Sequence, residues 1–467
     1  MAIALDRAFT EDDPPGRSAG QHRIARFERF LDARAGGPLP PVRPVAGSHS
    51  EYQGNHAGRP PALPDDLSGG DEEFTAGRAD DFHFDTALVK EAFAHVEPHV
   101  PKAMEYFYAH LFVQHPEMRA MFPLTMSEHR ERVFAALACL VWSMDAPVAL
   151  STYLGELGVQ HRKFGVKKKH YTAFFDALLA TVRHFSGPAW TEQTRQAFTT
   201  AVGHTAAVML RAADLDAQHQ PAWWLGEVVR HELRSPGLAV LRIRPDRPLR
   251  YRSGQYLSVQ VARWPRVWRK YSIANAPRPD GLLDLHVRAV PGGMVSNALV
   301  HHCQAGDTVL LGQARGEMKA PADRERDLVC IAGGSGLAPI KAIIEEVIAA
   351  GAGPGRRPGI CLFVGAQYPG ELYDMPALRA MEAGYPPLTV IPVVSADPGF
   401  AGARGMLPAV VRQRASCAGR EIYVCGPDAM VRETKRLLAC RGAAQAIHND
   451  PPAAVTDDLL TGAHPEA

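Results

Sequence analysis

The hydrophobic pattern of this chain changes its period twice, and this constrains the fold more than any other feature. From about Phe84 to Ala213, apolar residues recur at helical spacing, with glycine and proline at the joints. After Trp224, short segments alternate between apolar and polar residues, as half-buried strands do. From Asp327 on, apolar strand-like runs alternate with helical ones. Three such patterns predict a multidomain protein with separate cores.

Each pattern predicts one domain. Residues 81–216 are expected to form an all-helical domain, residues 220–326 a small antiparallel β-barrel, and residues 327–450 a parallel, doubly wound α/β sheet. The main predicted helices are 103–113, 128–144, 150–161, 169–185, 191–213, 340–350 and 428–440. The predicted strands are 237–244, 256–261 and 282–290 in the barrel, and 328–332, 360–364, 388–394 and 421–424 in the sheet.

The two ends of the chain lack these patterns. Residues 1–80 combine low hydrophobicity with clustered prolines and glycines, which predicts disorder, and we expect the same of residues 451–467. Residues 22–34 could form a docking helix, although a transient helix is the simpler interpretation.

Composition narrows the class of partner. Lys and Arg total 51 against 50 Asp and Glu, a formal charge of +1, so we expect no nucleic-acid partner. No apolar run reaches the roughly 18 residues that a membrane helix needs, and the start of the chain lacks a secretory signal. Seven cysteines without a CxxC pair favour reduced thiols. We therefore expect a cytoplasmic protein without a membrane partner, and we take it to be a monomer.

The barrel region carries two segments that suit a flavin dinucleotide. Arg269 can hold a diphosphate bidentately, Tyr271 can stack on a flat ring, and Ser272 can hydrogen-bond a flavin edge. This segment follows one predicted strand and precedes another. Further on, Gly293 and Ser296 offer backbone amides and a hydroxyl at the start of a helix, which suits phosphate oxygens.

Two segments of the α/β region suit a second nucleotide. The glycine-rich turn 333–339 lies between the first strand and the first helix, where a dinucleotide approaches closely. The segment 425–427, Cys-Gly-Pro, ends a later strand at the same edge of the sheet. Any one of these four segments alone is weak, because most glycine-rich turns are only turns. All four in this order are a strong signal.

Over residues 222–449 these segments resemble the ferredoxin-reductase-like flavoprotein family. The resemblance implies FAD stacked near Tyr271, NAD(P)H over the glycine-rich turn, and hydride transfer from nicotinamide to flavin. The residues that it implies for cofactor binding are Tyr256, Arg269, Lys270, Tyr271, Ser272, Gly293 and Ser296 for the flavin, and Gly334, Ser335, Gly336, Leu337, Ala338, Pro339, Cys425, Gly426 and Pro427 for the nicotinamide nucleotide.

Two departures from that family pattern matter. Proline stands at residues 451–452, where related chains end in an aromatic residue that covers the flavin. Residues 365–367 and 395–396 lack the arginine that commonly pairs with a 2′-phosphate, which favours NADH over NADPH.

The helical region offers an iron ligand. By itself, His161 would more often be a surface or capping histidine. Residues 116–122, however, resemble the globin corner with its haem-contacting phenylalanine, here Phe122, and residues 106–112 resemble the flavohaemoglobin helix with a distal tyrosine, here Tyr108. A globin followed by this reductase is similar to flavohaemoglobins. The resemblance implies haem b ligated by His161, with Tyr171 as the partner of that ligand and Tyr108 as hydroxyl donor to bound dioxygen.

Two positions differ from the family around the haem. At the position where the family usually has a distal glutamine, this chain has His129. This histidine can donate to bound oxygen, ligate the iron, or be a solvated helix residue. The glutamate of the proximal relay aligns near Ala213, beside Asp214, so this relay is shortened or missing.

The resemblance implies a nitric oxide dioxygenase, in which electrons pass from NAD(P)H to FAD to haem and the substrates are dioxygen and nitric oxide. Two alternatives stay open. One is a haem-based sensor of oxygen or redox state, with His129 as a sixth iron ligand. The other is an NAD(P)H-dependent flavin reductase with a degenerate globin.

Overall fold

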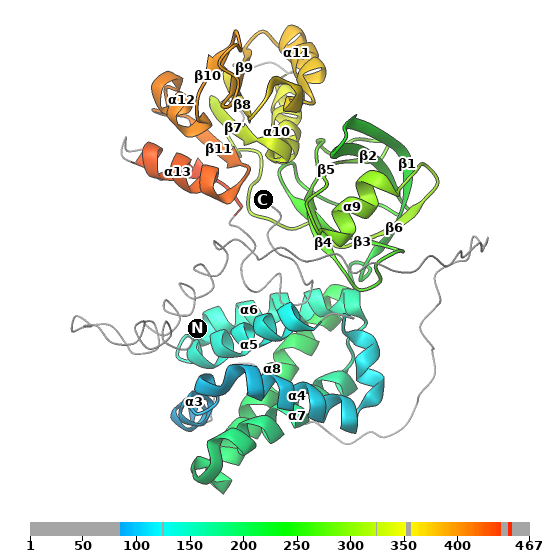
Figure 1. The fold of residues 1–467 in the computed structure, drawn as a ribbon, viewed down its shortest axis with the longest axis vertical. Helices are drawn as coiled ribbons and strands as arrows, with labels where there is room; N and C mark the ends of the chain where they lie inside the picture. The colour runs from blue at the N-terminus through cyan, green and yellow to red at the C-terminus, as the bar shows by residue number, and fades with distance from the viewer. Residues whose placement is uncertain (1–84, 124–125, 324, 352–355, 440–446, 451–467) are drawn as a thin grey trace, which may run out of the picture. The chain divides into compact units, whose positions relative to one another are not determined.

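A computed structural model describes residues 85–123, 126–323, 325–351, 356–439 and 447–450. The expectations for residues 1–80, 22–34 and 451–467 lie outside these ranges. The predicted order of a helical domain, an antiparallel barrel and a parallel α/β sheet is confirmed (Figure 1). None of the described helices combines the length and the apolar character that a bilayer crossing requires.

The described residues form two compact units. The first comprises the described residues up to Arg119, together with Arg130–Val159 and Lys167–Ala213. The second comprises Ala120–His129, Gln160–Val166 and the described residues from Asp214 on. Two short segments of the helical region therefore cluster with the reductase half of the chain.

Amphipathic helices build the helical region. Asp85 caps the first of them, since its Oδ1 accepts a hydrogen bond from the amide of Ala87 at 2.9 Å. The rings of Phe93 and Phe134 stack with their centroids 5.5 Å apart in the core. The helices are α3 (Thr86–Ala94), α4 (Val100–Gln114), α5 (Ser127–Trp142), α6 (Pro147–His161), α7 (Lys168–Ser186) and α8 (Glu192–Ala217), with 3-10 turns η1 (Glu97–His99), η2 (Pro116–Met121), η3 (Arg162–Phe164) and η4 (Gly187–Ala189).

A glycine lets α6 cross close to α8. A β-carbon at Gly158 would lie 2.1 Å from the carbonyl oxygen of Met209, so only glycine fits there. At Gly155, one turn earlier, a β-carbon would meet only the Cβ of Ala212 at 3.6 Å, an ordinary contact. This crossing fixes the course of the helix that ends at His161.

The barrel is a six-stranded antiparallel sheet in the order β4-β3-β6-β1-β2-β5. An isolated bridge between Ile273 and Leu285 links its two edges, so the sheet is nearly closed. Inward-facing residues such as Leu241, Leu257 and Val259 are fully buried. The strands are β1 (Trp224–Ser235), β2 (Leu238–Pro245), β3 (Tyr256–Val261), β4 (Arg269–Ser272), β5 (Leu283–Arg288) and β6 (Thr308–Leu311), and helix α9 (Met294–His301) packs against β2, β3 and β5.

The last region is a parallel sheet in the order β10-β9-β8-β7-β11-β12. Its central strand β7 is buried along its whole length, as expected for a sheet with helices on both faces. The strands are β7 (Leu328–Gly333), β8 (Ile360–Ala366), β9 (Leu388–Val394), β10 (Ala403–Arg404), β11 (Glu421–Cys425) and β12 (Ile447–His448), and the helices and 3-10 turns are η5 (Gly334–Gly336), α10 (Leu337–Ala350), η6 (Pro369–Glu371), α11 (Met375–Gly384), α12 (Leu407–Arg414) and α13 (Asp428–Ala439).

Three barrel strands, β1, β4 and β6, differ from the prediction, and β6 lies outside every predicted strand. The segment 269–272, expected between two strands, is itself strand β4 and pairs antiparallel with β3. Strand β1 was not predicted, because its alternation is interrupted where the register shifts between Val228 and Arg230. Long-range pairing with β2 and β6 makes this irregular segment a strand.

Candidate functional site

A cavity of about 490 Å³ opens at the carboxyl ends of β7, β8, β9 and β11. The chain runs from β7 to β8, β9 and β10 on one side and returns to β11 on the other, so the cavity lies where the strand order reverses. Open α/β sheets bind their ligands at this point. Strands β4 and β5 of the barrel supply further lining residues.

Close packing of two glycine-containing segments forms the floor of the cavity. A β-carbon at Gly336 would lie 2.4 Å from the carbonyl oxygen of Cys425, and one at Gly426 would lie 3.0 Å from the backbone of Gly333. Gly334 has a φ of 54°, which favours glycine. Desolvation raises the pKa of the Cys425 thiol to about 12, so this group is protonated at neutral pH. Because no side chains project from the glycines of these two segments, a dinucleotide can approach their backbone closely.

The predicted flavin segment lies on paired strands. Tyr256 is opposite Ser272, and Val259 is opposite Arg269, in the β3–β4 pair. The ammonium group of Lys270 lies 5.1 Å from the centroid of the Tyr256 ring. The side chains of Arg269 and Tyr271 are both largely buried. These cationic and aromatic groups suit the diphosphate and ring of a flavin nucleotide.

The second predicted flavin segment is held by its own hydrogen bonds. Oγ of Ser296 accepts a hydrogen bond from the amide of Val290 at 3.3 Å, and Nδ2 of Asn297 donates to the carbonyl oxygens of Val290 and Gly293 at 2.7 and 2.6 Å. These bonds fix the turn that opens α9. A hydroxyl that accepts here retains its own proton for donation.

Not every predicted cofactor residue lines the cavity. Leu337 and Pro339 are buried in the first turn of α10, and Tyr256, Arg269, Gly293 and Ser296 are also absent from its lining. Those that line it are Lys270, Tyr271, Ser272, Gly334, Ser335, Gly336, Ala338, Cys425, Gly426 and Pro427.

The sequence reasoning missed three polar residues of the lining: His286, Arg288 and Glu371. His286 and Arg288 are two positions apart on β5, so the predicted strand at 282–290 already placed their side chains on the same face of the sheet. Nδ1 of His286 lies 2.9 Å from the hydroxyl of Tyr373, and burial lowers the pKa of His286 to about 4, so the ring is neutral. No sequence motif marks Glu371.

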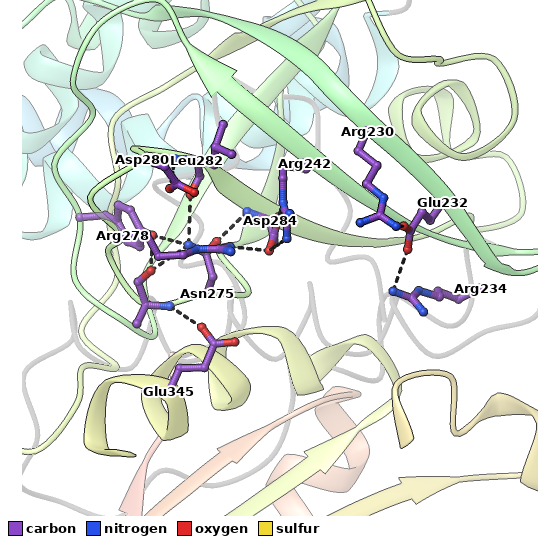
Figure 2. Close-up of polar contacts among 12 residues, drawn as sticks. Arg230, Glu232, Arg234, Arg242, Asn275, Arg278, Asp280, Leu282, Asp284 and Glu345 are labelled. Atoms are coloured by element: carbon purple, nitrogen blue, oxygen red, sulfur yellow. Dashed lines mark hydrogen bonds and ion pairs between the residues drawn. The ribbon is translucent and has the colours of Figure 1, made fainter. Parts of the chain in front are cut away.

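An ion-pair network anchors the strand that carries these residues (Figure 2). Asp284 of β5 accepts hydrogen bonds from Nε and Nη2 of Arg242 at 2.7 and 3.0 Å, and a further one from Arg278. On α10, Glu345 accepts a hydrogen bond from the amide of Ala276 at 3.0 Å. The ion pairs therefore tie the two barrel strands β2 and β5 together, and Glu345 separately ties the loop after β4 to the first helix of the α/β region.

In the first unit, Tyr108 and Tyr171 are buried. Burial raises the pKa of Tyr108 well above its usual value, although the nearby Arg130, whose guanidinium lies 6.0 Å from the ring centroid, opposes this shift. Burial likewise raises the pKa of Tyr171. Both phenols are therefore protonated at neutral pH, as hydrogen-bond donors must be.

The second unit holds the other predicted haem residues. His129 is buried, and its ring lies edge-on to that of Phe122, with centroids 5.3 Å apart. His161 ends α6, as predicted. Desolvation, helped by the positive charge of Lys163, lowers the pKa of His161 to about 3. A neutral imidazole at a helix end fits a histidine-ligated haem iron.

Within this unit, the turn after His161 contacts the flavin-binding strands. The ring of Phe164 lies edge-on to Trp268, with centroids 6.4 Å apart, and Nζ of Lys163 lies 5.4 Å from the centroid of Trp268. The same ammonium donates a hydrogen bond to Oγ of Ser258 at 3.3 Å. Trp268 immediately precedes the arginine of the flavin segment. The residues expected to bind iron and flavin are thus linked by packed side chains.

Family models match three parts of the chain. A globin model matches residues 105–209, an oxidoreductase FAD-binding domain matches residues 227–319, and an oxidoreductase NAD-binding domain matches residues 330–436. The order is the one predicted from the sequence.

Individual relatives fall into two groups. The reductase component of the naphthalene 1,2-dioxygenase system of Pseudomonas putida is 31% identical over 227 residues, covering 48% of this chain and 67% of that protein. A flavohemoprotein of Bordetella pertussis is 27% identical over 283 residues, covering 56% of this chain and 70% of its own length. The match to the xylene/toluene monooxygenase electron transfer component of Pseudomonas putida spans 62% of that protein. The solved flavohemoglobin of Malassezia yamatoensis aligns with a TM-score of 0.62 at 15% identity, covering 78% of this chain and 97% of its own, a likeness in fold.

The fold and the cavity define an FAD- and NAD-binding oxidoreductase module, and the chain belongs to this reductase family. Because a globin precedes the module, the chain has the flavohaemoglobin architecture, with haem, FAD and NAD as its cofactors.

Proposed function

We propose that this chain oxidises nitric oxide to nitrate with dioxygen, drawing electrons from NAD(P)H. The observation that carries the proposal is the contact of the turn after His161 with Trp268 and Ser258 beside the flavin segment. A reductase that passed its electrons only to a separate acceptor protein would not need the turn after the expected iron ligand to contact the flavin-binding strands. The flavohemoproteins among its relatives support this assignment.

The chain's own residues would bind and orient the reactants. When bound, NAD(P)H supplies hydride, FAD divides the electron pair, and haem binds dioxygen. His161 would hold the iron through a neutral ring, and Tyr171 would orient that ring. Tyr108 would donate a hydrogen bond to the dioxygen substrate, with His129 as a second donor. Arg269 would hold the flavin diphosphate.

Separate variants test these roles. Tyr108→Phe should slow aerobic nitric oxide consumption while leaving flavin reduction by NADH intact; unchanged consumption would remove Tyr108 from the mechanism. His161→Ala should abolish the haem absorbance band, and full haem occupancy would reject the ligand assignment. Arg269→Ala should empty the flavin site, which normal FAD content would contradict.

A reductase that feeds another acceptor is the second candidate. It is favoured by relatives named as electron transfer or reductase components. It predicts NADH-driven dye reduction with no consumption of nitric oxide. The comparison of these two rates in the same preparation separates the candidates.

We further propose a cytoplasmic location and a monomeric state. The described cysteines, 139, 303, 330, 361, 417 and 425, are free thiols, which fits a reducing compartment. The domain boundaries at residues 81–216, 220–326 and 327–450 are likewise our proposal.

A further inference from the structure

The cavity has two ends of opposite charge. Its cationic lining residues in the described part of the chain, Lys270 and Arg288, both come from barrel strands. The guanidinium of Arg288 lies 3.8 Å from where a β-carbon of Gly334 would be, beside the glycine-rich turn. At the ends of β8 and β9 the lining instead holds the carboxylate of Glu371, together with Gln367 and other uncharged residues. Positive charge therefore lies where phosphates would bind, and negative charge lies further along the sheet edge.

The chain itself holds the Glu371 carboxylate in place. The turn η6 brings Glu371 back over the end of β8, where its Oε2 accepts hydrogen bonds from the amides of Gln367 and Tyr368 at 2.9 and 3.2 Å. Two backbone amides that donate to Oε2 fix the orientation of the carboxylate. These two bonds do not use its other oxygen, Oε1. The carboxylate is thus an oriented acceptor in the cavity wall.

A dinucleotide whose nicotinamide reaches Tyr271 must extend its adenosine away from the barrel, past the glycine-rich turn. Its route leads over the ends of β8 and β9, the side toward which the strand order β7-β8-β9 runs. A ribose with a free 2′-hydroxyl can donate to a carboxylate there, whereas a 2′-phosphate is repelled by it.

We propose that Glu371 selects NADH over NADPH, by accepting a hydrogen bond from the 2′-hydroxyl of the adenosine ribose and excluding a 2′-phosphate. This inference rests on the proposed use of the cavity for a nicotinamide coenzyme. It does not depend on nitric oxide being the final substrate.

Binding of adenosine fragments tests the proposal without any turnover. The full chain, loaded with FAD, is titrated calorimetrically with 5′-AMP and with 2′,5′-ADP. The unsubstituted protein should bind 5′-AMP about tenfold more tightly, and Glu371→Gln should reduce this preference to about threefold or less. The glutamine retains an acceptor for the two amides, so the turn is kept.

Two further variants separate selectivity from general affinity. Arg288→Gln should weaken NAD⁺ and NADP⁺ binding by the same factor and leave their ratio unchanged. Gln367→Arg, which leaves the Glu371 turn intact, should strengthen 2′,5′-ADP binding selectively. It serves as the test if Glu371→Gln fails to fold.

Ferricyanide reduction supplies the kinetic readout. The ratio of kcat/KM for NADH to that for NADPH should fall by about threefold or more in Glu371→Gln, the same change as in fragment binding. An unchanged ratio in both assays, or equal binding of the two fragments by the unsubstituted protein, would overturn the proposal. A chain that discriminates between the coenzymes but consumes no nitric oxide would overturn only the proposed function.

Discussion

The substitution Asp284→Asn tests the ion-pair network that anchors β5. Asparagine keeps the shape of the side chain but loses the charge that Arg242 and Arg278 share. Hydrogen bonds to charged groups contribute about 1.5–3 kcal/mol each when buried. Here 34% and 30% of the two arginine side chains are exposed, and solvent screens part of the interaction. We therefore expect the free energy of unfolding to fall by about 2 kcal/mol in total.

The effect has a defined pH dependence. Burial alone would raise the pKa of Asp284, but the hydrogen bonds and charges of Arg242 and Arg278 outweigh it and hold this pKa below its usual value. Stability from such a carboxylate is fully present above its unfolded pKa, about 3.9, and is lost as the pH falls through the folded pKa. The difference between the two proteins should be constant from about pH 7 to 5 and shrink below about pH 4.

Thermal unfolding of the FAD-loaded chain, followed by release of flavin fluorescence, measures this directly. A loss of about 2 kcal/mol corresponds to a midpoint about 4–8 °C lower for a unit of this size. The matched control is Glu227→Gln, which removes a barrel ion pair to Arg244 whose side chains are about half exposed; we expect a change below about 0.5 kcal/mol. Equal shifts in both variants, or a shift that does not depend on pH, would refute the reasoning.

Three other predictions follow from close contacts. Gly336→Ala should lower NAD⁺ affinity at least tenfold in calorimetric titration, because its β-carbon meets backbone on β11, whereas Gly370→Ala, in open space, should not. Gly158→Ala should lower haem retention and cost about 1–3 kcal/mol through its clash with α8, and Gly155→Ala should be near neutral in the same absorbance assay. Lys163→Met should slow haem reduction by NADH in stopped flow but leave ferricyanide reduction unchanged; equal slowing of both would contradict a role in coupling the two sites.

Periodicity and motif position predicted the features that depend on local sequence. The helix that ends at His161 and the strand–turn–helix around Gly334 both follow from short stretches of chain, since period and turn residues mark their ends. The order of the three domains followed in the same way.

The parts that sequence reasoning missed depend on pairing between distant segments. Glu371 enters the cavity because a short turn folds it back over β8, and Arg288 enters because strand register sets its face. Strand β1 is assembled by partners far along the chain. Likewise, nothing local to Phe164 indicates its contact with Trp268.

The most direct test of the account is nitric oxide consumption in air by the full chain loaded with haem and FAD. With NADH, we expect continuous consumption with nitrate as product and about one NADH oxidised for every two nitric oxide molecules, because each hydride carries two electrons and each nitrate formed requires one. NADH-driven ferricyanide reduction without loss of nitric oxide would contradict the central claim.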